Sequence, residues 1–217
     1  MTKELKNRII TSCVLILLLL SCLYINNYSW LSLLTIVSLI SLYEIIVIGK
    51  RIFKDNLNFF LFSLISCIYF ITFVFTAYKS KLIFNELGIL FILSVCMLSD
   101  IGGYIIGKFI GGKKLTKISP NKTISGTFGS FLFSLLPLIF ASKIFSNSVL
   151  IIFMFCLIIS LICQLGDLFI SFLKRKANVK DTGDLLPGHG GILDRIDGIV
   201  FALPLGMILW EFLIVIL

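Results

Sequence analysis

The run VLIIFMFCLIISLICQL, from Val149 to Leu165, contains no charged residue and approaches the ~20 residues that a helix needs to cross a bilayer. Six further apolar runs lie at about Ile9–Ile25, Tyr28–Ile48, Leu57–Ala77, Leu82–Ser99, Phe128–Ile144 and Ile199–Leu217. The chain is 59% hydrophobic, and its mean hydropathy of +1.10 is typical of membrane proteins. The sequence therefore predicts an all-α polytopic integral membrane protein, a bundle of about seven transmembrane helices.

The chain has a net charge of +8, and its positive residues lie mainly in the connections between these runs. Most lysines and arginines lie in residues 3–8, 50–54, 108–122 and 174–195. With seven spans, the positive-inside rule places these segments in the cytoplasm. The charge therefore predicts an inner-membrane protein with a polar site facing the cytoplasm, and no nucleic-acid partner.

Polar residues are scarce in the first half of the chain. We predict a scaffold of transmembrane helices over residues 1–99 and a catalytic membrane region over residues 100–217. Glu44 is the exception, near the cytoplasmic end of the second run. A carboxylate within a bilayer is costly and is usually retained for a partner or a pathway, but one near a helix end can also reach the interface. Both interpretations of Glu44 stay open.

A glycine- and lysine-rich segment runs from Asp100 to Thr123. Glycine lets a backbone approach a phosphate closely and lysine supplies charge, but the spacing of a P-loop is absent. On these residues alone, a basic loop that touches anionic lipid headgroups is the favoured interpretation.

The most polar segment is SFLKRKANVKDTGDLLPGHGGILDRID, from Ser171 to Asp197. If the preceding run continues as a helix, Ser171 and Lys174 lie only about 40° and 20° from Asp167 around its axis. The alternative is that Lys174 simply snorkels to the interface. If helix begins at Asp194, its carboxylate and that of Asp197 share a face, or they offset the helix dipole.

Three aspartates and several cations in this region suit phosphate chemistry. Asp167, Asp194 and Asp197 offer the oxygen ligands that Mg²⁺ prefers, while lysine and arginine neutralise phosphoryl oxygens. The combination predicts phosphoryl or nucleotidyl transfer with Mg²⁺, and a second cation such as K⁺ is compatible with it.

The pattern Ser171-x2-Lys174-Arg175-x4-Lys180-Asp181-x5-Pro187-Gly188-His189-Gly190-Gly191-x2-Asp194-Arg195-x-Asp197 resembles the signature of phosphatidate cytidylyltransferases. The resemblance extends over about Asp100–Gly198. It implies transfer of CMP from CTP to phosphatidic acid in the bilayer, giving CDP-diacylglycerol and pyrophosphate. Family members also suggest a homodimer, although no pattern in this sequence marks an interface.

The resemblance implies three sets of site residues. The catalytic set is Ser171, Lys174, Arg175, Lys180, Asp181, His189 and Arg195. The substrate-binding set is Asp100, Ser119, Pro120, Lys122, Thr123, Pro187, Gly188, Gly190 and Gly191. The metal ligands are Asp167, Asp194 and Asp197. His189 would shape the nucleotide turn or assist protonation.

The chain departs from the family pattern after Thr123, where it reads Ile124-Ser125-Gly126 and many relatives have Trp followed by Glu or Gln. It is also shorter than many relatives. Neither departure touches the charged segment.

Two other functions are compatible with parts of the sequence. Residues 194–198 resemble the start of the CDP-alcohol phosphotransferase motif, but an apolar helix follows in place of the further aspartates. An ion-coupled transporter would use Glu44, Asp100 and Asp167 as intramembrane carboxylates.

Overall fold

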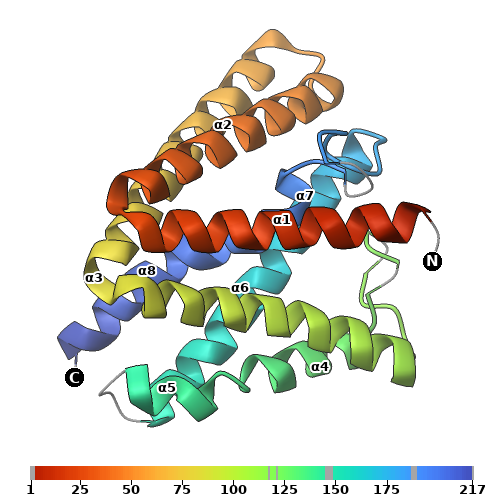
Figure 1. Cartoon of the computed structure of the whole chain (residues 1–217). Coiled ribbons are helices and arrows are strands. Elements are labelled where there is room, and N and C mark those ends of the chain that lie inside the picture. Colours follow the sequence, from red (N-terminus) through yellow and green to blue (C-terminus); the bar gives the residue numbers. More distant parts are fainter. Residues whose placement is uncertain (1–2, 117, 121, 145–148, 187–189, 217) are drawn as a thin grey trace. The chain divides into compact units, whose positions relative to one another are not determined.

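The structure is a computed structural model that describes residues 3–116, 118–120, 122–144, 149–186 and 190–216 (Figure 1). Its helices are α1 (Lys3–Ile25), α2 (Asn27–Ile52), α3 (Asn56–Ile110), α4 (Ile124–Ser134), α5 (Leu138–Ile144), α6 (Val149–Lys176), α7 (Leu193–Ile196) and α8 (Ile199–Ile216). Extended pairing in these described ranges is limited to the isolated bridges Lys114–Thr123 and Leu186–Gly190. The prediction of an all-α protein is confirmed.

Several helical stretches have the length and composition of membrane spans. In the part of the chain that the structure describes, four stretches are long and apolar enough to cross a bilayer: Asn27–Ile52, Asn56–Ile110, Ile124–Ala141 and Val149–Lys176. Shorter apolar stretches occupy Ile10–Ile25 and Ile199–Glu211. The chain is a helical membrane protein, and the count of seven spans stays a prediction.

Two predicted boundaries differ from the structure. The sequence places a connection at residues 78–81, whereas α3 continues through them and is interrupted at Asn85, with φ 58° and ψ −172°. Lys81 can remain buried within the helix because Glu86 lies 3.8 Å from its ammonium. The run Phe128–Ile144 is divided into α4 and α5 near Pro137, which has no N–H to continue a helical ladder.

The chain divides into two compact units, one of residues 1–79 and 173–196 and the other of residues 80–172 and 197–217. In the first unit, α2 and the early part of α3 form an antiparallel pair (Figure 1). Trp30 donates from its indole nitrogen to the Ala77 carbonyl at 3.3 Å, and Ser38 donates to the Phe70 carbonyl at 3.3 Å. The functional division at residue 100 stays a prediction.

The second unit contains the later part of α3 with α4, α5, most of α6, and α8. Its core brings together Val95, Ile152, Phe155 and Ala202, all almost fully buried. The Ser99 and Ser160 hydroxyls share a 2.8 Å hydrogen bond that joins α3 to α6. These contacts fix the part of α6 that carries Asp167.

Glycines set the contact between α3 and α4. A Cβ atom on Gly129 would lie 2.6 Å from the Gly102 carbonyl oxygen, and one on Gly126 would lie 2.8 Å from that of Gly103. The two backbones therefore touch, as they do where small residues line the interface of membrane helices. This contact brings the first turn of α4 against the end of α3.

Candidate active site

A polar cavity of about 280 Å³ lies in the second unit, where α3, α4, α6 and the basic loop before α4 meet. Its lining consists of Asp100, Gly103, Tyr104, Ser119, Lys122, Thr123, Gly126, Thr127, Ser130, Gln164 and Asp167. Four predicted substrate-binding residues and one predicted metal ligand thus share one cavity. Pro120 lies in the turn of the same loop but outside the lining.

Two residues of the lining form an ion pair. The Lys122 ammonium contacts the Asp167 carboxylate, and about a quarter of each side chain is exposed. Ser171 donates to the other oxygen of Asp167 at 3.3 Å. A partly exposed ammonium of this kind can exchange its carboxylate partner for a phosphate oxygen, because both are anionic acceptors.

The loop before α4 places Lys122. Gly111 and Gly112 adopt φ values of +63° and +105°, a backbone turn that favours glycine. The loop then folds back, with Leu115 donating to the Lys122 carbonyl at 2.8 Å. Thr123 caps α4 by accepting from the Gly126 N–H at 3.1 Å.

A second cluster lies in the first unit, around Asp194. One oxygen of its carboxylate accepts from the Lys174 ammonium at 2.7 Å. The other accepts from the backbone N–H of Thr182 at 2.7 Å and from that of Gly191 at 3.1 Å. The side chains of Lys174 and Asp194 are 11% and 3% exposed, so this is a buried ion pair with additional hydrogen bonds.

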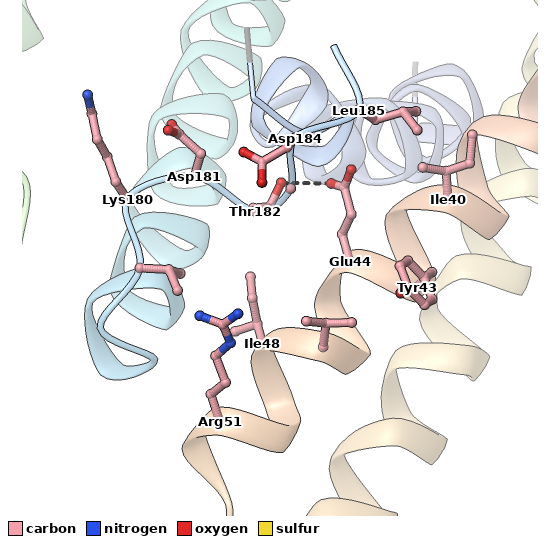
Figure 2. Close-up of a pocket in the computed structure, with 13 residues that line it drawn as sticks. Ile40, Tyr43, Glu44, Ile48, Arg51, Lys180, Asp181, Thr182, Asp184 and Leu185 are labelled. Atoms are coloured by element: carbon pink, nitrogen blue, oxygen red, sulfur yellow. Dashed lines mark hydrogen bonds between the residues drawn. The ribbon is translucent and has the colours of Figure 1, made fainter. Parts of the chain in front are cut away.

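Glu44 and Thr182 belong to the same cluster and are absent from the predicted site. The buried Glu44 carboxylate accepts from the Thr182 hydroxyl at 2.7 Å, shown by the dashed line in Figure 2. It also accepts from the N–H groups of Ile192 and Leu193, each at 2.9 Å. This decides between the two interpretations of Glu44: it has a protein partner. The sequence showed that a carboxylate at position 44 is costly in a bilayer. It could not show that the partner is Thr182, because the two residues are 138 positions apart and no local pattern connects them.

A cavity of about 510 Å³ lies beside this cluster, between α2 and residues 179–185 (Figure 2). The predicted catalytic residues Lys180 and Asp181 line it, and both are exposed. The Arg51 guanidinium lines the same cavity from α2. Arg175 is exposed and donates to the Val179 carbonyl at 3.3 Å.

The structure describes some of the remaining predicted residues and leaves three of them outside the described ranges. Gly190 packs close to Asp194 with φ +82°, and Arg195 is exposed. Pro187, Gly188 and His189 lie outside the described residues. Asp194 and Asp197 do not lie on one continuous helix, because α7 ends at Ile196 and Asp197 lies in the following turn, where it accepts from the Gly198 N–H at 2.9 Å.

The three predicted metal ligands divide between the two units, with Asp194 in the first and Asp167 and Asp197 in the second. Within the described ranges, no three His, Cys, Asp or Glu side chains come together as a metal-binding group. Both oxygens of Asp194 already accept hydrogen bonds. Its assignment as a metal ligand, like that of Asp197, stays a prediction.

The cluster predicts a pH dependence of stability. Burial alone would raise the pKa of Asp194, but the Lys174 ammonium and the N–H groups of Thr182 and Gly191 outweigh burial and hold this pKa below its usual value. The ionised carboxylate therefore contributes stability that is complete above the unfolded pKa of about 4 and is lost as the pH falls through the folded pKa. We expect the Tm advantage of wild type over Asp194→Asn to be constant from pH 7 to about 5 and to shrink below about 4. An unchanged difference at the lowest pH would contradict this.

Comparisons with known proteins agree with the resemblance in the sequence. The model of the cytidylyltransferase family matches residues 51–213. A phosphatidate cytidylyltransferase of Helicobacter pylori is 40% identical over 139 residues, 63% of this chain and 51% of that protein. Those of Staphylococcus epidermidis and Staphylococcus aureus are 46% and 48% identical over 120 residues, 54% of this chain and 46% of each relative. The chain spans about half the length of the curated relatives it matches.

Proposed function

Because the chain belongs to the cytidylyltransferase family, we propose that it transfers CMP from CTP to phosphatidic acid, giving CDP-diacylglycerol and pyrophosphate. The observation that carries the proposal is the family match over residues 51–213, which includes the cavity residues around Asp167 and the residues from Lys174 to Asp194. The relatives named phosphatidate cytidylyltransferase support the same choice of substrates.

The cavity of the second unit is suited to a nucleotide phosphate. Lys122 supplies positive charge, and the hydroxyls of Ser119 and Thr123 supply donors. The first turn of α4 also lines the cavity, and the N-terminus of a helix favours an anion. We assign this cavity to the triphosphate of CTP.

The reaction requires little proton transfer. An oxygen of the lipid phosphate attacks the α-phosphorus of CTP, a new phosphorus–oxygen bond forms, and the bond to the β-phosphate oxygen breaks as pyrophosphate leaves. The second pKa of a phosphomonoester is about 6, so the attacking oxygen is already ionised near neutral pH. Catalysis then depends on positioning and on charge stabilisation by groups such as Lys122.

The residues of this cavity also fit Mg²⁺. Asp100 and Asp167 provide two carboxylates, with hydroxyl and amide oxygens beside them. Mg²⁺ typically binds through one or two carboxylates together with substrate phosphates. We propose that Asp167 and Asp100 hold the ion, which when bound neutralises charge on the phosphates.

The proposed reaction fits an inner-membrane enzyme whose site faces the cytoplasm, since CTP is available there. The transporter alternative loses one of its three carboxylates, because Glu44 is engaged by Thr182, Ile192 and Leu193. The family match also does not favour a CDP-alcohol phosphotransferase. A homodimer is proposed from the resemblance alone and is tested by native mass spectrometry.

The direct test uses purified protein in lipid nanodiscs with CTP, phosphatidic acid and magnesium. We expect CDP-diacylglycerol and pyrophosphate in equal amounts, and no product when diacylglycerol replaces phosphatidic acid, because diacylglycerol lacks the attacking phosphate. Replacing CTP by ATP tests the choice of base, and EDTA tests the requirement for magnesium. Well-folded protein without turnover would contradict the proposal.

A further inference from the structure

The carboxylate of Glu44 is enclosed by the segment that carries the family signature. It is 4% exposed on α2 and accepts hydrogen bonds from the Thr182 hydroxyl and from two successive backbone N–H groups, those of Ile192 and Leu193. Each donor belongs to residues 182–193, so one side chain of α2 holds both ends of this loop. An acid buried at such a position is costly to keep without a task.

Two glycines of the loop leave room for this carboxylate. A Cβ atom on Gly183 would lie 3.0 Å from one Glu44 oxygen, and a Cβ atom on Gly191 would lie 2.6 Å from the same oxygen. A Cβ on Gly191 would also collide with the Thr182 hydroxyl. Residues 182–183 and 191–193 are therefore shaped around Glu44, and this accounts for the glycine at position 191 independently of any phosphate contact.

Thr182 links Glu44 to Asp194. Its hydroxyl lies 2.7 Å from a Glu44 oxygen and 3.0 Å from an Asp194 oxygen, and its N–H donates to that same Asp194 oxygen. A hydroxyl has one proton, so it donates to one carboxylate at a time. The Asp194 carboxylate in turn holds the Lys174 ammonium at 2.7 Å. A continuous chain of contacts thus runs from α2 to a predicted catalytic lysine.

We propose that Glu44 is a positioning residue, which fixes residues 182–183 and 191–193 and, through Thr182 and Asp194, the Lys174 ammonium. Glu44 contacts no substrate in this role, because its carboxylate is occupied by the loop (Figure 2). The catalytic part of this inference rests on the proposed function. The structural part, that Glu44 anchors the loop, does not.

The main test is Glu44→Gln in nanodiscs, followed by hydrogen–deuterium exchange and by steady-state kinetics. Glutamine keeps one acceptor oxygen but turns an NH₂ group toward backbone donors. We expect faster exchange at Ile192 and Leu193, unchanged exchange in α4, and a kcat at least about 10-fold lower, since small misplacements of catalytic groups are costly. The KM for CTP should stay within about threefold, because binding contacts are retained. Asp184→Asn removes an exposed carboxylate close to Thr182, serves as the control for exchange, and should leave exchange at Ile192 and Leu193 unchanged.

A second pair of variants covers the case in which Glu44→Gln folds poorly. Thr182→Val removes the hydroxyl that links the two carboxylates, whereas Thr182→Ser keeps it. We expect the valine variant to lose kcat and the serine variant to stay near wild type. Combining Thr182→Val with Glu44→Gln should cost little more than the worse single change, because both break one link. Equal rates for the two Thr182 variants would overturn the inference.

The outcomes separate the two claims. A wild-type protein with a protected loop and no turnover contradicts the proposed function and the catalytic part of this inference. An active wild type whose exchange and kcat are unaffected by Glu44→Gln contradicts the inference alone.

Discussion

Replacing Lys122 by methionine is expected to lower kcat by about 100- to 1000-fold, the usual cost of removing one preorganised group that stabilises transition-state charge. Methionine keeps much of the apolar stem of lysine but not its ammonium. In the resting structure this ammonium pairs with Asp167 in the cavity assigned to the triphosphate. The measurement is steady-state formation of CDP-diacylglycerol at saturating CTP.

Lys113→Met is the matched control for this prediction. Lys113 belongs to the same basic loop and is exposed, but it does not line the cavity. Both variants remove one positive charge from the loop, so a loop that only touches anionic headgroups would respond equally to either. We expect Lys113→Met to retain near-normal kcat. Equal losses of kcat in Lys122→Met and Lys113→Met would contradict a specific role for Lys122 and would favour a loop that only touches anionic headgroups.

Gly129→Ala is expected to lower the free energy of unfolding by about 2 kcal/mol, a fall in Tm of about 4–8 °C, with a parallel loss of activity. The added methyl would lie 2.6 Å from the Gly102 carbonyl oxygen, and neither backbone can yield without separating α3 from α4. The same separation would widen the cavity, because Gly103 and Gly126 belong to both the contact and the lining. Thermal unfolding in detergent and turnover in nanodiscs measure the two effects.

Gly206→Ala provides the comparison on α8. Its added methyl would also lie 2.6 Å from a neighbouring atom, but that atom is Cδ1 of Ile159, the end of a flexible side chain. The side chain can change rotamer, so we expect a Tm within about 2 °C of wild type. If both alanine variants were equally stable, the backbone contact between α3 and α4 would not limit the fold.

Most of the helices could be predicted from composition, because a bilayer requires apolar stretches near a fixed length with internally satisfied backbones. The errors lie where that rule gives no local signal. Lys81 marked a connection in the sequence, yet its pairing with Glu86 allows the helix to continue to Asn85. The division of the fifth run at Pro137 depended on a single residue that a hydropathy average does not register.

The sequence by itself determined the helical membrane class, the family and the residues that carry charge, because hydropathy and motif spacing are properties of the linear chain. The sequence also indicated that the carboxylate of Glu44 is costly within a bilayer and needs a partner or access to the interface. Only the tertiary structure decided which groups meet: Lys122 with Asp167, Lys174 with Asp194, and Glu44 with Thr182. Lys174 and Asp194 are 20 positions apart, and Glu44 and Thr182 are 138 positions apart. In the first pair, Lys122 lies in the loop before α4 and Asp167 lies on α6. How helices and loops pack decides which of these residues meet, and no local pattern in the sequence encodes it.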